Sequence, residues 1–163
     1  RVAKRLHGWE CEIIYADVQP YSNEYEAAAG AKRVDFGELI ETSDVVSLHV
    51  PLDHTTEKIL SDREFSRMKP GAIVINACRG PGIDGSALVR ALDDGLIAGA
   101  GLDVTEIEPI EEANPLIGRN NVVLIPHHAG MSVEARQKSV DNAIANAKLL
   151  MTGKGPNGIV LPV

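Results

Sequence analysis

Three ionisable side chains of types that take part in catalysis each follow a short apolar run. They are Arg79, Glu108 and His127, and the runs that precede them span 72–77, 97–104 and 121–126. A guanidinium can grip a carboxylate through two charge-assisted hydrogen bonds, and an imidazole can exchange a proton near neutral pH. A carboxylate beside that imidazole stabilises its protonated form. Brought together, the three groups would make a catalytic set.

Each of these residues also has an ordinary structural explanation. An arginine after an asparagine-containing turn is usually a surface or capping residue. Glu108 lies among other acidic residues, and such a run is usually solvated. A histidine after a proline at the end of a strand is commonly structural. What favours function is the recurrence of the same arrangement at three strand ends.

The runs themselves predict the fold. Each is short, rich in β-branched or small residues and bounded by glycine, proline or charge, which is typical of a strand buried on both faces. Helical stretches lie between and after them, at 61–69, where Ser61 and Glu64 form a capping box, at 83–93 and at 131–151. This alternation predicts an α/β fold, a doubly wound parallel sheet of the Rossmann-like type. Since such sheets bind ligands at the carboxyl ends of their strands, Arg79, Glu108 and His127 should converge there.

Composition restricts the class of protein. The chain has 163 residues, 44% of them hydrophobic and 24% charged, which is typical of a globular domain. A net charge of −7 argues against a nucleic-acid or anionic-membrane surface, and no apolar run is long enough to span a membrane. With only Cys11 and Cys78 present, no disulfide framework is expected and a cytoplasmic location is predicted. No histidine pair has the spacing of a metal site.

Two features leave alternatives open. Gly80-Pro-Gly-Ile-Asp-Gly85 fits the G-x-G-x-x-G pattern of a dinucleotide-binding loop, yet it lies late in the chain and is also explained as a glycine-rich turn. Asp17 ends the apolar run 11–16. It is either the acid that accepts hydrogen bonds from an adenosine ribose or a loop residue that starts a turn before Pro20.

Several motifs in register carry a family resemblance. They are Val46-Ser-Leu-His-Val-Pro-Leu52, Met68-Lys-Pro-Gly-Ala72, Asn76-Ala-Cys-Arg-Gly80, Gly101-Leu-Asp-Val104 with Glu108-Pro109, and Asn114-Pro-Leu116 with Pro126-His127. In these the chain resembles the D-isomer-specific 2-hydroxyacid dehydrogenases. In this register the segment Gly80–Gly85 follows the substrate arginine and is not the phosphate loop. Departures at Asp53-His54 and Ile125 affect loop detail, and His128, where an aliphatic residue is commoner, affects the assignment of His127.

The resemblance implies a role for each matching position. Arg79 would bind the substrate carboxylate and polarise its carbonyl, His127 would be the general acid and base, and Glu108 would hydrogen-bond His127 and favour its protonated form. Asp17 would contact the ribose and Asp103 the nicotinamide carboxamide. Arg79 and His127 would also contact NAD, and the remaining cofactor-lining positions would be Val50, Pro51, Thr56, Ala77 and Cys78.

The implied function is hydride transfer between NAD(H) and a D-2-hydroxy acid or 2-oxo acid, in a cytoplasmic homodimer. Residues 1–163 would form an NAD-binding domain that lacks its first strand and glycine-rich loop, with the substrate-binding domain absent from this chain. Two alternatives remain at this point. One is an NAD(H)-sensing binding module of the corepressor type, and the other is an inactive fragment of the dehydrogenase.

Overall fold

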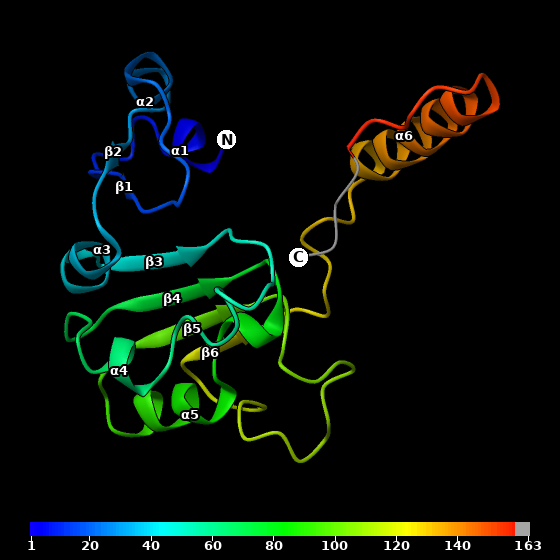
Figure 1. Cartoon of the computed structure of the whole chain (residues 1–163). Helices are drawn as coiled ribbons and strands as arrows, with labels where there is room; N and C mark the ends of the chain where they lie inside the picture. Colours follow the sequence, from blue (N-terminus) through cyan, green and yellow to red (C-terminus); the bar gives the residue numbers. More distant parts are fainter. Residues whose placement is uncertain (159–163) are drawn as a thin grey trace.

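A four-stranded parallel sheet forms the centre of the protein (Figure 1). The structure is a computed structural model, and it describes residues 1–158. The strands of the sheet lie in the order β3-β4-β5-β6 and comprise Val45–Leu48, Ile73–Asn76, Gly99–Leu102 and Val122–Leu124. Every neighbouring pair is parallel. The predicted α/β class with a parallel sheet is therefore confirmed. Residues 159–163, part of the predicted 1–163 domain, lie outside the described residues.

Three helices bury one face of this sheet. They are α3 (Phe36–Thr42), α4 (Asp62–Phe65) and α5 (Gly85–Asp93), and a 3-10 turn, η1 (Gly80–Gly82), leads into the last of them. Ile40, Phe65 and Leu88 from these helices pack with Val74 of β4 in one core, each 2% exposed or less. The predicted capping box at the start of α4 is present. The strands that precede Arg79, Glu108 and His127 thus belong to a sheet with a well-buried core.

On β3, β4 and β6 the opposite face of the sheet carries exposed residues. Val45, Ile73 and Val123 are 56%, 40% and 67% exposed, whereas the alternate positions of β3 and β4 are buried. The prediction of strands buried on both faces is therefore wrong for β4 and β6, whereas β5 is buried or half-buried at every residue. The physical reason is that the buried helix residues within 1–158 all come from α3, α4 and α5, which pack on a single face.

A second, smaller sheet is formed near the amino terminus. It pairs β1 (Ile14–Tyr15) with β2 (Lys32–Arg33), and α1 (Val2–Arg5) and α2 (Asn23–Ala29) lie beside it. Neither helix buries a residue, and no described strand joins β1 or β2 to β3. Figure 1 shows this unit set apart from the four-stranded sheet, which differs from the single sheet that the sequence pattern predicts.

Helix α6 (Val133–Met151) is long, as predicted from 131–151, but it has no buried residue. Ser132 caps its first turn by accepting a hydrogen bond from the backbone N–H of Ala135. The helix extends away from both sheets (Figure 1). Its formation here therefore depends on backbone hydrogen bonding and capping instead of on packing against the core.

Candidate active site

Arg79, Glu108 and His127 lie beyond the carboxyl ends of three adjacent parallel strands. Arg79 follows β4, Glu108 follows β5 and His127 follows β6. Because β4, β5 and β6 are neighbours and point the same way, the three residues share one edge of the sheet, as predicted. All three are exposed, so they are accessible to a small molecule.

Glu108 and His127 form a direct pair. Nδ1 of His127 lies 2.9 Å from Oε2 of Glu108, and Oε1 of Glu108 accepts a hydrogen bond from the backbone N–H of Thr105 at 3.1 Å. The hydrogen bond with His127 and that with Thr105 lower the pKa of the Glu108 carboxyl. A carboxylate can only accept, so the proton between the two residues belongs to Nδ1, and Nε2 is left as the nitrogen for chemistry.

The backbone of His127 is held in an uncommon conformation by Asp103. The φ angle of His127 is +54°, in the left-handed region, and its N–H donates to the carbonyl of Asp103 at 2.7 Å. The Asp103 carboxylate, which is 4% exposed, accepts from the N–H groups of His128 and Ala129 at 2.6 and 2.9 Å. Asp103 therefore fixes the segment that aims His127 at Glu108, and His127, not His128, pairs with the carboxylate.

The loop of Arg79 is shaped by Asn76, a motif residue for which the sequence predicted no role of its own. Asn76 is 1% exposed, donates to the carbonyl of Arg79 at 2.9 Å and accepts from the N–H of Cys78 at 3.0 Å. The sequence signal was present. Asn76 is a polar residue at a position where the alternation of β4 requires burial, and buried amides are kept only when they are hydrogen-bonded.

The positions predicted to line the cofactor fall on the same edge, in the loops that follow β3 and β4. They are Val50, Pro51, Thr56, Ala77 and Cys78. Thr56 donates its hydroxyl hydrogen to the carbonyl of Pro51 at 2.6 Å, and Cys78 donates its thiol to the carbonyl of Leu48 at 2.7 Å. Burial raises the pKa of the Cys78 thiol, which favours a wall residue over a nucleophile. These contacts give the edge a defined shape.

Asp17 follows β1, in the smaller sheet. Its Oδ1 accepts from the N–H of Gln19 at 2.8 Å, which is the turn that the sequence allowed, and its carbonyl accepts from Arg33 at 2.8 Å. The carboxylate is exposed, so it can accept further hydrogen bonds, as a ribose would require. Both the turn and a ribose contact are therefore compatible with this position.

Residues 1–158 contain neither a metal-ligand cluster nor a helix suited to cross a membrane. No group of three or more His, Cys, Asp or Glu side chains there could hold a metal ion. Of the helices in the described part of the chain, none combines the length and the apolar character that crossing a membrane requires.

Comparisons with known proteins agree with this geometry. Residues 1–129 match a family model described as "D-isomer specific 2-hydroxyacid dehydrogenase, NAD binding domain". Glyoxylate reductase from Thermofilum pendens is 39% identical over 158 residues, which are 97% of this chain and 47% of that protein. The chain thus spans about half the length of the curated relatives it matches.

Solved structures give the same result. Apo D-mandelate dehydrogenase from Rhodotorula graminis superposes with a TM-score of 0.87 at 37% identity, over 98% of this chain and 48% of that one. The NAD-complexed D-isomer-specific 2-hydroxyacid dehydrogenase from Lactobacillus delbrueckii ssp. bulgaricus gives a TM-score of 0.85 at 30% identity, over 98% and 51% of the two chains.

Proposed function

This chain belongs to the D-isomer-specific 2-hydroxyacid dehydrogenases, through the NAD-binding domain of that family, and from this premise we propose that it interconverts a 2-oxo acid and a D-2-hydroxy acid. The observation that carries the proposal is the Glu108–His127 pair at 2.9 Å, on the sheet edge that it shares with Arg79. A proton donor and a carboxylate-binding cation on one sheet edge suit the reduction of an α-oxo acid.

In this proposal Arg79, His127 and Glu108 have different roles in the reaction. Reduction adds a hydride to the carbonyl carbon of the 2-oxo acid and a proton to its oxygen, and NADH, when bound, supplies the hydride. Arg79 binds the substrate carboxylate through its planar guanidinium and polarises the adjacent carbonyl. His127 gives the proton from Nε2, and Glu108 stabilises the protonated ring while fixing its orientation through Nδ1. Oxidation of the D-2-hydroxy acid uses the same groups in reverse.

We propose NAD in preference to NADP as the cofactor. An anionic Asp17 accepts well from a free 2′-hydroxyl, whereas it would repel a 2′-phosphate. Asp17→Ala should therefore weaken NADH binding and reduce the preference for NADH over NADPH. The measurement is KM for each cofactor in the parent and the variant, with Asp62→Ala on the exposed surface of α4 as the matched control. Equal use of both cofactors by the parent would contradict the proposal.

The test of the function is NADH oxidation by the full-length protein with a panel of 2-oxo acids, including glyoxylate, hydroxypyruvate and pyruvate. We expect turnover that yields the D-2-hydroxy acid, and a loss of kcat/KM in Arg79→Ala, because that variant lacks the carboxylate clamp. Arg63→Ala, an exposed arginine on α4, is the control. Tight NADH binding without turnover of any 2-oxo acid would contradict the dehydrogenase and favour the NAD(H)-sensing alternative.

Four further predictions concern the domains, the oligomeric state and the location of the protein. They are the role of residues 1–163 as an incomplete NAD-binding domain, the location of the substrate-binding domain outside this chain, the homodimer and the cytoplasmic location. Light scattering of the full-length protein tests the dimer. Hydride transfer that requires residues beyond this chain would support the division into two domains.

A further inference from the structure

The segment that carries Glu108 has little apolar support of its own. Val104 and Leu116 are buried at its two ends, at 3% and 5% exposed, and no residue between them is buried. A cavity of about 340 Å³ lies against this segment. Its walls include Val89, Leu102, Val104, Glu106, Ile107 and Leu116. Because apolar packing does not fill this space, the position of Glu108 must depend on polar contacts.

Within the segment the hydroxyl of Thr105 donates to the carbonyl of Ile107 at 2.8 Å, and Glu106 provides the contact that reaches α5. Oε2 of Glu106 accepts a hydrogen bond from the N–H of Gly85, the first residue of α5, at 3.2 Å. Its Oε1 lies 3.9 Å from Nζ of Lys58, which also pairs with Asp84, the capping residue of α5, at 3.0 Å. A negative charge at the start of a helix is favourable, since the first N–H groups there lack helical partners.

The attachment lies next to the contact that aims Glu108. Thr105 precedes Glu106, and its N–H holds Oε1 of Glu108. Gly80, the residue after Arg79, approaches the same backbone so closely that a Cβ on it would lie 1.8 Å from the carbonyl oxygen of Thr105. The segment thus packs closely on the Arg79 loop where Thr105 meets Gly80. One residue later, Glu106 binds it to the start of α5.

We propose that Glu106 is a positioning residue for the catalytic pair, fastening the segment 104–109 to the amino-terminal end of α5 so that Glu108 faces His127. The proposal rests on the proposed dehydrogenase function. It assigns Glu106 no contact with substrate or cofactor. The loop of Arg79 has its own support from Asn76, so the grip on the substrate carboxylate does not depend on Glu106.

The first readout is kinetic, in the full-length protein. Glu106→Ala should lower kcat about 10- to 100-fold, the cost of a small misplacement of a catalytic group, while KM for the 2-oxo acid changes much less. Glu106→Gln keeps an acceptor for the N–H of Gly85 and should restore most of the rate. In the double variant Glu106→Ala/Glu108→Gln the rate should be close to that of Glu108→Gln alone, because both changes act through one carboxylate.

The second readout needs no turnover. The groups that face the Glu108 carboxyl are His127 and the N–H of Thr105, which lower its pKa, and Asp103, which opposes them. If Glu106→Ala loosens the segment, the pKa of Glu108 should rise toward its usual value. Carbon-13 NMR titration of the side-chain carboxyl measures this. If the parent protein turns over no 2-oxo acid, the proposed function is wrong. The titration would still decide whether Glu106 positions Glu108.

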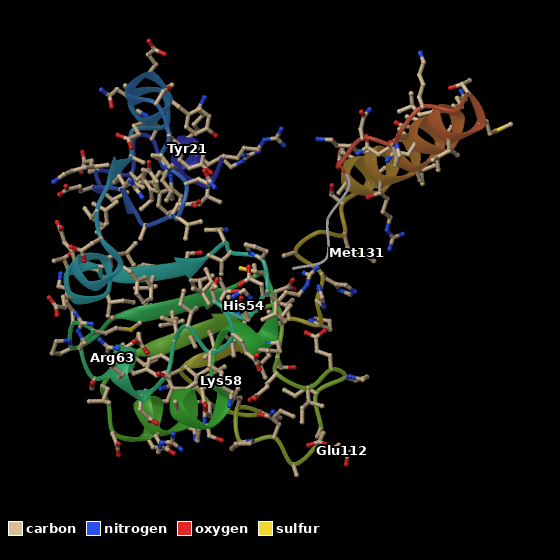
Figure 2. All side chains as sticks on the ribbon, in the orientation of Figure 1. Tyr21, His54, Lys58, Arg63, Glu112 and Met131 are labelled. Atoms are coloured by element: carbon tan, nitrogen blue, oxygen red, sulfur yellow. The ribbon has the colours of Figure 1, made fainter. Side chains whose placement is uncertain are left out.

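Two further variants complete the test. Gly85→Ala disturbs the contact of Glu106 without removing Glu106, and Glu112→Ala is the control. A Cβ at Gly85 would lie 2.8 Å from Oε2 of Glu106, the far end of a flexible side chain, so Gly85→Ala should displace that carboxylate without harming the helix. It should reproduce part of both effects. Glu112→Ala removes an equal charge from the exposed loop that continues beyond residue 109 (Figure 2) and should change neither readout.

The proposal is overturned if Glu106→Ala and Gly85→Ala behave like Glu112→Ala in both readouts. It is also overturned if the kinetic effects of Glu106→Ala and Glu108→Gln simply multiply, since Glu106 would then act on something other than Glu108.

Discussion

The four-stranded sheet and the smaller β1–β2 unit differ in what stabilises them. The first has a core in which Ile40, Leu60 and Val74 are each 0% exposed. The second has no buried residue in α1, α2 or β2, and its tyrosines, such as Tyr21 and Tyr25, stack at the surface. The proposed proton-transfer pair, Glu108 and His127, therefore follows strands of the well-packed sheet. The proposed ribose contact, Asp17, follows a strand of the lightly packed unit. Variants in the two regions should therefore fail in different ways.

The largest effect is expected at the edge of the four-stranded sheet that carries the proposed catalytic residues. His127→Ala removes the proton donor and should lower kcat about 10²- to 10⁴-fold, the usual contribution of a general acid. His128→Ala is the matched control, because its backbone N–H still reaches Asp103 while its ring is dispensable in this account. Steady-state kinetics of both variants decides between them. Activity that survives His127→Ala and is lost in His128→Ala would assign the role to the other histidine.

The next effect concerns stability. Phe65 is 1% exposed, and Phe65→Ala should cost about 3–5 kcal/mol of the free energy of unfolding through lost burial and the cavity left behind. Tyr25→Ala in the smaller unit should cost about 1 kcal/mol or less, because Tyr25 is 56% exposed and loses only its stacking on Tyr21. Urea unfolding of both variants measures the difference. Equal losses would mean that the two regions are equally packed.

A smaller effect is expected at the helix caps. Asp84 caps α5 by accepting from the N–H of Ala87, and this hydrogen bond, together with Lys58, lowers the pKa of Asp84. Asp84→Ala should cost about 1 kcal/mol near neutral pH. Because the pKa is lower in the folded than in the unfolded protein, the charged group's contribution is present above pH ~4, near the unfolded value, and is lost as pH falls through the folded value.

The comparison with Ser22 sharpens that prediction. Ser22 caps α2, which buries nothing, so Ser22→Ala should affect global unfolding less than Asp84→Ala and without the loss below pH ~4. Denaturant titrations at pH 7 and pH 3 measure both differences. A stability loss in Asp84→Ala that is the same at the two pH values would contradict the ionic part of the cap.

The sequence predicted the parallel α/β fold and the strand ends because these depend on local patterns. The runs before Arg79, Glu108 and His127 carry the strand signal within a few residues. It did not predict that Val45 and Ile73 are exposed, because apolar strands indicate burial without indicating what covers them. The local contacts of Asn76 with Cys78 and Arg79 were within reach of the sequence, since a polar residue stands at a buried position of β4. The contact of Glu106 with Gly85 was not, because it depends on how segments distant in sequence meet.

The most direct test of the central claim, that Glu108 stabilises the protonated form of His127, is the pH–rate profile of Glu108→Gln. The neutral amide can still hold the ring but cannot stabilise a positive charge on it. We predict that the fall in reduction rate with rising pH begins at a lower pH in the variant, so that its deficit is smaller at low pH than at high pH. A profile that is scaled down uniformly, with no shift along the pH axis, would contradict the claim.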